Sequence, residues 1–184
     1  MGLPGASFLA GPARAAVAYL FLLSSEAIMP DADSPSILQD PLVCNGAALR
    51  KATRRVSQLY DTVLAPCGLK VSQHSILVHI ARAGSPSMTD LARAMVLDRS
   101  ALAHNLKPLE RDGYVHMARD ERDGRSRRVA LTEAGRDKLA ESKRLWKDAQ
   151  RRFEAAYGAE RAAALRTSLA DIFSDEFALA FSRG

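Results

Sequence analysis

Residues 98–115 read DRSALAHNLKPLERDGYV, and residues 120–135 read DERDGRSRRVALTEAG. In the first stretch Leu102, Leu106 and Leu109 recur at helical spacing, and Asp98 is of a residue type that caps helix N-termini. In the second stretch an Asp-Gly pair stands between two short runs with β-favouring residues, which is a strong local signal for a hairpin. The two stretches together predict a helix followed directly by a charged β-hairpin.

The segment before this helix predicts a second, shorter helix. Ser87 or Thr89 can begin a helix over MTDLARAM, and only Val96 and Leu97 bridge it to Asp98. Two short helices joined by a tight turn, the second with polar residues in its first turns, are the helix-turn-helix pattern. A hairpin that follows such a pair is a wing.

Helical periodicity extends in both directions from this centre. Upstream, apolar residues at steps of three and four predict a helix over residues 47–64, which Pro66 and Gly68 end. Ser72 is expected to cap the next helix, which ends at Gly84. Downstream, Thr132 is expected to cap a helix that continues to Gly158, and a further apolar stripe runs over residues 162–181. These narrow apolar seams favour burial against a second copy of the chain; a monomer that folds them back on itself is the alternative.

The expected fold is therefore mainly α with a small β wing, a winged helix-turn-helix core flanked by N- and C-terminal dimerisation helices. The predicted divisions are a loosely ordered arm over residues 1–40, an N-terminal dimerisation helix over 41–66, a DNA-binding domain over 67–131, and C-terminal dimerisation helices over 132–184. A short apolar run within residues 13–27 mimics a secretory signal, but it is too short for an ordinary transmembrane helix. Met29 is a candidate native start.

Charge and residue types predict DNA as the partner. The net charge of +5 favours an anionic partner, and a recognition helix enters the major groove with its N-terminal residues foremost. An arginine at a wing tip can enter the minor groove, where Asp123 could brace Arg125 by a bidentate pair; a solvated charged hairpin is the alternative for the wing taken alone. The predicted DNA contacts are Arg99, Ser100, Ala101, His104, Asn105, Lys107, Arg122, Asp123, Arg125 and Arg127.

The two quoted stretches, together with LYDTVLAPCGLKVSQHSIL at residues 59–77, resemble the MarR family of winged-helix transcription regulators. The shared motifs are the D-x-R-D-x-R wing and the L-T-x-x-G that follows it. The resemblance implies a cytoplasmic homodimer on a roughly palindromic double-stranded DNA operator, usually repressing, and released by a small ligand or by thiol oxidation. It also implies that residues 98–112 are the recognition helix and Arg125 the wing arginine. Relatives often carry arginine where this chain has His104, a difference that bears on the operator sequence.

The two cysteines offer a redox hypothesis. In peroxide-sensing members of the family a reactive cysteine lies near the start of the first helix, and Cys44 lies close to that place, about two residues early. Cys67 stands where leucine is common, so packing is the alternative for it. Along one straight helix the two Cα atoms would lie about 34 Å apart, far beyond disulfide reach, whereas Cys44 of one subunit could meet Cys67 of the other.

The resemblance also implies a pocket for phenolic or other aromatic acids between the dimer helices and the DNA-binding lobe. Either trigger would act by stabilising a spacing of the two recognition helices that misses successive major grooves. For each candidate lining residue of this pocket, a place in the core or on the solvated surface is the alternative explanation. The candidate lining residues are Arg54, Arg55, Tyr60, His74, Leu77 and Trp146.

Other classes of protein find little support in the residue spacing. The four histidines show no H-E-x-x-H or similar pattern, neither cysteine has a paired base in sequence, and no C-x-x-C pair occurs. We therefore expect no enzyme activity, no cofactor, no metal site and no membrane partner.

Overall fold

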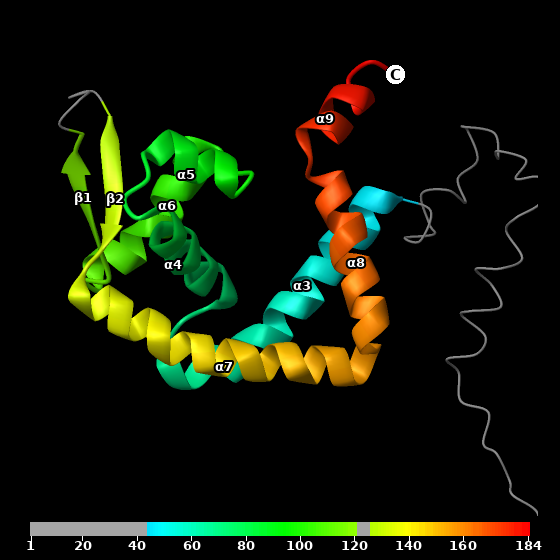
Figure 1. Ribbon diagram of the computed structural model, residues 1–184, viewed down its shortest axis with the longest axis horizontal. Helices are drawn as coiled ribbons and strands as arrows, with labels where there is room; N and C mark the ends of the chain where they lie inside the picture. Colours follow the sequence, from blue (N-terminus) through cyan, green and yellow to red (C-terminus); the bar gives the residue numbers. More distant parts are fainter. Residues whose placement is uncertain (1–43, 121–125) are drawn as a thin grey trace, which may run out of the picture. The chain divides into compact units, whose positions relative to one another are not determined.

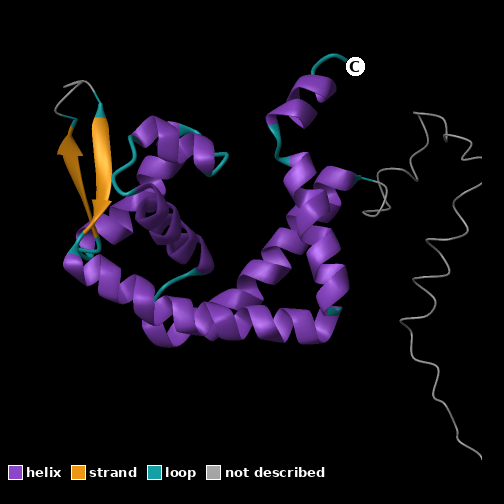
Figure 2. Cartoon of the chain, viewed as in Figure 1, coloured by secondary structure: helices purple, strands orange, loops and turns teal. Residues whose placement is uncertain are grey.

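Helices make up most of the computed structural model, which describes residues 44–120 and 126–184 (Figures 1 and 2). The described part also contains a two-stranded antiparallel sheet. In chain order the elements are α3 (Asn45–Leu64), the 3-10 turn η1 (Ala65–Cys67), α4 (Val71–Ala83), α5 (Met88–Ala94), α6 (Arg99–Arg111), β1 (Val115–Arg119), β2 (Arg127–Leu131), α7 (Glu133–Tyr157), α8 (Ala159–Ile172) and α9 (Asp175–Phe181). This is the mainly α fold with a β wing that the sequence predicts.

The chain divides into two compact units between residues 50 and 51. Of the first unit the structure describes residues 44–50, which begin α3, and the packing between elements described below lies within the second unit. The division of the chain at residues 40, 66 and 131 stays a prediction.

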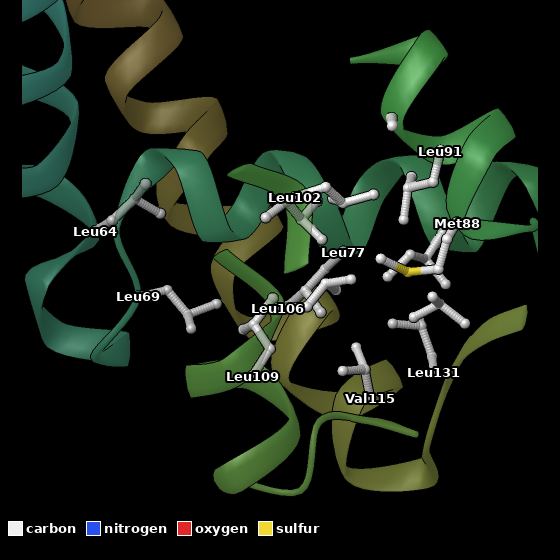
Figure 3. Packing of buried hydrophobic residues seen from close by; sticks show 14 of the residues in the cluster. Leu64, Leu69, Leu77, Met88, Leu91, Leu102, Leu106, Leu109, Val115 and Leu131 are labelled. Atoms are coloured by element: carbon white, nitrogen blue, oxygen red, sulfur yellow. The ribbon is translucent and has the colours of Figure 1, made fainter. Parts of the chain in front are cut away.

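The core lies where α4, α5 and α6 meet the hairpin. Leu77 of α4, Leu91 of α5 and Leu106 of α6 have almost no exposed surface, and their side chains point toward one another (Figure 3). Val115 of β1 and Val129 of β2 close the same cluster from the hairpin side. Burying a side chain of this size stabilises the fold by about 1.5–3 kcal/mol, so these residues hold the helix-turn-helix and the hairpin together as one body.

Helix starts follow the predicted caps with one exception. Asp98 accepts the Ala101 N–H at 2.7 Å, Ser87 accepts the Asp90 N–H at 3.1 Å, and Thr132 accepts the Gly135 N–H at 2.9 Å. These three caps are confirmed.

The cap predicted for α4 is wrong. The helix begins at Val71, one residue before Ser72, because the Asp61 carboxylate of α3 accepts the Val71 N–H at 2.7 Å. The Asp61 side chain thus satisfies one of the free N–H groups at the start of α4, and Lys70, not Ser72, is the N-cap residue.

The hairpin is paired from Val115 opposite Leu131 to Arg119 opposite Arg127. Strand β2 also contacts the segment that precedes α5. The Val129 N–H donates to the Pro86 carbonyl at 3.0 Å, and Ser87 forms an isolated antiparallel β-bridge with Arg128. Strand β2 is therefore held both by β1 and by the segment that precedes α5.

Helix α7 leaves the hairpin and passes α4, against which it packs (Figure 1). It ends at Gly158, whose φ of 94° lies in a region that favours glycine. The apolar stripe expected over residues 162–181 is divided into α8 and α9, because Ser174 starts a new helix by accepting the Phe177 N–H at 3.1 Å.

Candidate DNA-binding surface and ligand cavity

Helix α6 has one buried face and one polar face. Leu102, Leu106 and Leu109 are fully buried, whereas the residues of the first turns that the sequence predicts to face DNA stand on the other side. Four of those residues are exposed, namely Arg99, Ser100, His104 and Lys107, and two are half-buried, namely Ala101 and Asn105. The helix runs through Pro108 to Arg111, so the proline lies near the end, away from these polar turns.

The hairpin adds positive charge beside this face. Arg127 is exposed at the start of β2, and Arg128 pairs with Asp120 across the two strands at 2.9 Å. Asp120 is largely buried, with 13 % of its side chain exposed, so this pair braces the base of the wing. The predicted wing residues Arg122, Asp123 and Arg125 lie outside the described residues.

A surface hollow of about 390 Å³ lies between the start of α6 and the hairpin. Three of the predicted DNA contacts lie around it: Arg99 and Ser100 at the start of α6 and Arg127 of β2, which is distant from them in sequence. The other lining residues, Met88, Ala103 and Met117, were not predicted to belong to this surface. The alternation of β1 was the available signal for Met117, because it places that side chain on the same face of the strand as Val115.

A larger cavity of about 470 Å³ lies between α4 and α7. Two of the predicted ligand residues, His74 and Trp146, line it together with seven others. The lining consists of Val71, His74, Ser75, Val78, Ala81, Arg82, Leu139, Lys143 and Trp146. The spacing of three and four residues along both helices could have identified Lys143 and Arg82, had the facing sides of α4 and α7 been known.

The other predicted ligand residues lie elsewhere. Leu77 is fully buried in the core, and Tyr60 donates from its hydroxyl to Gln150 at 2.8 Å while its ring meets Phe153 edge to face. Burial and the nearby Glu154 raise the pKa of Tyr60, so its hydroxyl stays protonated at neutral pH. Arg54 and Arg55 are exposed on α3 and do not line the cavity.

His74 is the most constrained polar group of the cavity. Its Nδ1 lies 2.9 Å from the Ser142 hydroxyl, which in turn donates to the Leu139 carbonyl at 3.1 Å. Its ring stacks on Trp146, with centroids 5.9 Å apart and the planes inclined by 21°. Burial, followed by the positive charge of Lys143, lowers the pKa of His74 below its ordinary value of about 6.5. His74 is therefore uncharged at neutral pH.

The two cysteines have different surroundings. Cys44 is exposed, and its sulfur accepts the Ala47 N–H at 3.4 Å. Cys67 is buried, and its thiol donates to the Leu64 carbonyl at 3.0 Å, as expected for a residue that packs. The role of Cys44 in sensing oxidants stays a prediction.

Residues 44–120 and 126–184 contain neither a candidate metal cluster nor a helix that could span a membrane. No group of three or more His, Cys, Asp or Glu side chains there is placed to hold a metal ion. No helix among those residues is both long and apolar enough to cross a membrane.

Comparison with known proteins places the winged-helix part of the chain in one family. A model described as "MarR family" matches residues 68–126. The transcriptional activatory protein BadR of Rhodopseudomonas palustris is 40% identical over 72 residues, which are 38% of this chain and 41% of BadR. The regulator SarZ of Staphylococcus epidermidis is 29% identical over 58% of its length, so the match spans less than two thirds of these curated relatives.

Solved structures resemble a longer part of the chain. The Mycobacterium tuberculosis regulator MosR, in a crystal structure with DNA, is 32% identical and has a TM-score of 0.65, with 71% of this chain and 93% of MosR covered. The repressor CouR bound to a DNA duplex is 28% identical and has a TM-score of 0.66, with 82% of this chain and 100% of CouR covered. From the sequence match at its centre and the fold shared over most of its length, the chain belongs to the MarR family of winged-helix transcription regulators.

Proposed function

We propose that this chain is a homodimeric transcriptional repressor that binds a roughly palindromic DNA operator in the cytoplasm and leaves it when a small aromatic or phenolic ligand binds. The observation that carries the proposal is the surface formed by α6 and the hairpin, where Arg99, Ser100 and Arg127 surround one hollow. Arginine suits both phosphates and the edge of guanine, and a polar first turn suits insertion into the major groove. MosR and CouR, which share this fold, have each been solved with DNA.

The proposed dimer is supported by apolar side chains that the described chain leaves uncovered. Phe173, Phe177 and Phe181 on and beside α9 are between 46 and 81% exposed, and Ile172 and Leu179 beside them are exposed as well. Exposed apolar surface of this extent on consecutive helices is typical of an interface. A C2 dimer would also place two recognition helices for the two halves of a palindrome.

The proposed ligand site is the cavity between α4 and α7. Its aromatic wall of His74 and Trp146 suits a flat ring, and Lys143 and Arg82 suit an anionic group. CouR, at 25% identity and a TM-score of 0.62, has also been solved with p-coumaroyl-CoA, a phenolic conjugate. A thiol-based release through Cys44 is the second candidate, favoured by the exposure of its sulfur.

Anisotropy titration onto a labelled duplex from the chain's own upstream region tests the proposed function. Arg99→Ala is expected to weaken binding at least about tenfold, because a lost base or phosphate contact of a bidentate group costs about 1–3 kcal/mol. Lys147→Ala removes the same charge from the exposed surface of α7 and should change affinity less than about twofold. The same loss is expected for Arg125→Ala if the wing tip enters the minor groove.

Three outcomes would contradict parts of this proposal. Equal affinity of Arg99→Ala and Lys147→Ala would remove α6 from the interface. Absence of saturable binding by the wild type to any segment of its upstream region would refute operator binding. Peroxide-induced release that Cys44→Ser abolishes would replace the ligand by the thiol as the trigger.

A further inference from the structure

The surface hollow between the start of α6 and the hairpin has an apolar floor and a cationic rim. Two methionines form the floor. Met88 is only 8% exposed and belongs to the core cluster (Figure 3), and Met117 is half-buried and packs against that cluster. The rim consists of the exposed lining residues, namely Arg99, Ser100, Ala103 and Arg127. A group that fills the hollow therefore meets apolar surface at the bottom and positive charge around the edge.

The packing of the hairpin against α5 holds the floor in place. The β-bridge between Ser87 and Arg128 brings Met88, the first residue of α5, beside the hairpin. Met117 stands opposite the fully buried Val129, and residues that are directly opposite in an antiparallel pair share one face of the sheet. A thioether has no proton to donate, and its sulfur is only a weak acceptor. The two side chains of the floor therefore cannot satisfy a hydroxyl group that is pressed against them.

The rim carries two arginines whose charge is available to a ligand. Arg99 is the first residue of α6 and Arg127 the first residue of β2, and neither forms an ion pair within residues 44–120 and 126–184. The adjacent Arg128, by contrast, pairs with Asp120 at 2.9 Å. Guanidinium groups bind phosphates in a bidentate manner. Two of them, on two different elements beside an apolar floor, suit a group that is apolar in the middle and anionic on both sides.

We propose that the hollow receives one deoxyribose of the operator and that its methionine floor excludes ribose at that nucleotide. The sugar lies on the two methionines, and Arg99 and Arg127 meet the phosphates on either side of it. With α6 in the major groove and the wing at the adjacent minor groove, the sugar–phosphate backbone between the grooves crosses the hollow. A ribose would press its 2′-hydroxyl against the thioethers without a partner. The inference rests on the proposed function, in which α6 and the hairpin contact DNA.

A thymine methyl group is the other apolar group that DNA offers to such a floor. The position of the hollow favours the sugar, because Met117 comes from β1 of the hairpin, whereas base edges in the major groove are read by the recognition helix. The two arginines also match two phosphates, which flank every sugar within a strand. The methyl group is therefore the rival occupant that the experiment must exclude.

Single-nucleotide substitutions in the duplex of the anisotropy titration test the inference. Each nucleotide of the shortest duplex that binds the full chain is replaced in turn by the ribonucleotide and by its 2′-fluoro analogue. Both have the same preferred sugar pucker, but only the ribonucleotide has a hydroxyl group that needs a partner. At one nucleotide of each half-site, the duplex with the ribonucleotide is expected to bind at least about fivefold more weakly than the duplex with the 2′-fluoro nucleotide.

Two variants and one control assign the difference to the floor of the hollow. Met117→Gln and Met117→Thr each supply a hydrogen-bonding group there, and threonine also suits a β-strand. Both variants should reduce the difference at the sensitive nucleotide to less than about twofold. Met95→Gln makes the same change at a half-buried methionine outside the lining of the hollow, and it should keep the wild-type difference. Thermal unfolding identifies the variants that retain the fold.

The inference is overturned if no nucleotide separates the two sugars in the wild type, or if the separation persists in a folded Met117 variant. Replacement of thymine by deoxyuridine removes only the 5-methyl group. A loss of affinity on that replacement that Met117→Thr abolishes would assign the floor to a base and overturn the sugar assignment. Equal affinity for the two sugars at every position, with tight binding of the unmodified duplex, refutes this inference alone. Absence of duplex binding by the wild type refutes the proposed function and the inference together.

Discussion

Gly135 lies in the first turn of α7, where the backbone of Tyr114 passes so closely that a β-carbon would overlap its carbonyl oxygen. The same carbonyl accepts the Thr132 N–H at 3.1 Å, and the Thr132 hydroxyl donates to the Gly113 carbonyl at 2.6 Å. Next along α7, Lys138 donates to the Cys67 carbonyl at 3.2 Å. Threonine and glycine in the L-T-x-x-G motif thus fasten the start of α7 to the end of the helix-turn-helix.

The first prediction concerns this close approach. Gly135→Ala is expected to lower the free energy of unfolding by about 1–3 kcal/mol, since the added carbon must displace backbone. Gly46→Ala is the matched control, because it is also a helical glycine but its β-carbon would meet only the Arg50 side chain at ordinary contact distance. That control should be neutral or stabilise by up to about 1 kcal/mol. Urea unfolding measures both, and equal effects would show that α7 can move away from Tyr114.

Val96 shows that a single residue can also carry strain. It has a φ of 52° at the end of α5, where glycine is usual, and its side chain is 70% exposed. The hydrogen bonds from Val96 to the Arg93 carbonyl and from Leu97 to the Ala92 carbonyl close the helix end in the manner of a Schellman motif. The tight turn between α5 and α6 is thus maintained by backbone hydrogen bonds, against the preference of the side chain.

At the scale of the element, α6 depends on how it starts. Asp98 stands in extended conformation before the helix and accepts the Ala101 N–H, while the three buried leucines hold the opposite face. The cap determines where the first turn begins and therefore where Arg99 and Ser100 stand. Because Pro108 lacks an N–H, the helix has one hydrogen bond fewer near its end, and its integrity relies more on the first turns and the core face.

The second prediction separates capping from charge. Asp98→Ala is expected to cost about 1 kcal/mol of stability and to weaken operator binding, since the first turn of α6 loses its cap. Asp98→Asn keeps an acceptor oxygen of a good capping residue and should retain most of the stability. Thermal unfolding and anisotropy titration give the two readouts. A destabilisation of the same size in both variants would mean that the negative charge, rather than the cap, is what α6 needs.

At the scale of the whole molecule, the described chain leaves its C-terminal helices unevenly covered. Ala149 of α7 and Ala162 of α8 are buried, whereas the phenylalanines on and beside α9 are exposed. Phe177 and Phe181 stack with ring centroids 6.3 Å apart, which gives a continuous apolar patch. Such a patch is unfavourable in water, and a second copy is the partner proposed for it.

The third prediction tests that partner. Phe181→Asp is expected to raise the dimer dissociation constant at least about tenfold, because burying a phenylalanine is worth about 1.5–3 kcal/mol and the aspartate would be desolvated. Ser182→Asp adds the same charge one residue further along and serves as the control. Sedimentation velocity over a concentration series measures both. A dimer as stable in Phe181→Asp as in Ser182→Asp would place the interface elsewhere.

Most of the helix-turn-helix and its wing could be predicted because their signals are local. Cap residues, helical apolar spacing and the Asp-Gly pair each act over a few neighbours. The caps Asp98 and Thr132 and the buried leucines of α6 can therefore be predicted from the sequence alone. The failure at Ser72 has the opposite cause, since Asp61, ten residues away, is the acceptor at the start of α4.

The sequence by itself determined the family, the order of the elements, the buried face of α6 and the polar residues opposite it. Only the tertiary structure decided which side chains share a cavity. His74 and Leu77 lie three residues apart on α4, yet one lines the cavity with Trp146 and the other is buried in the core. Periodicity places residues on faces of a helix, but it does not say which neighbour each face meets, because that depends on how α4 and α7 pack against each other. The proposed ligand cavity therefore depends on packing, whereas the helix predicted to face DNA was already evident from spacing.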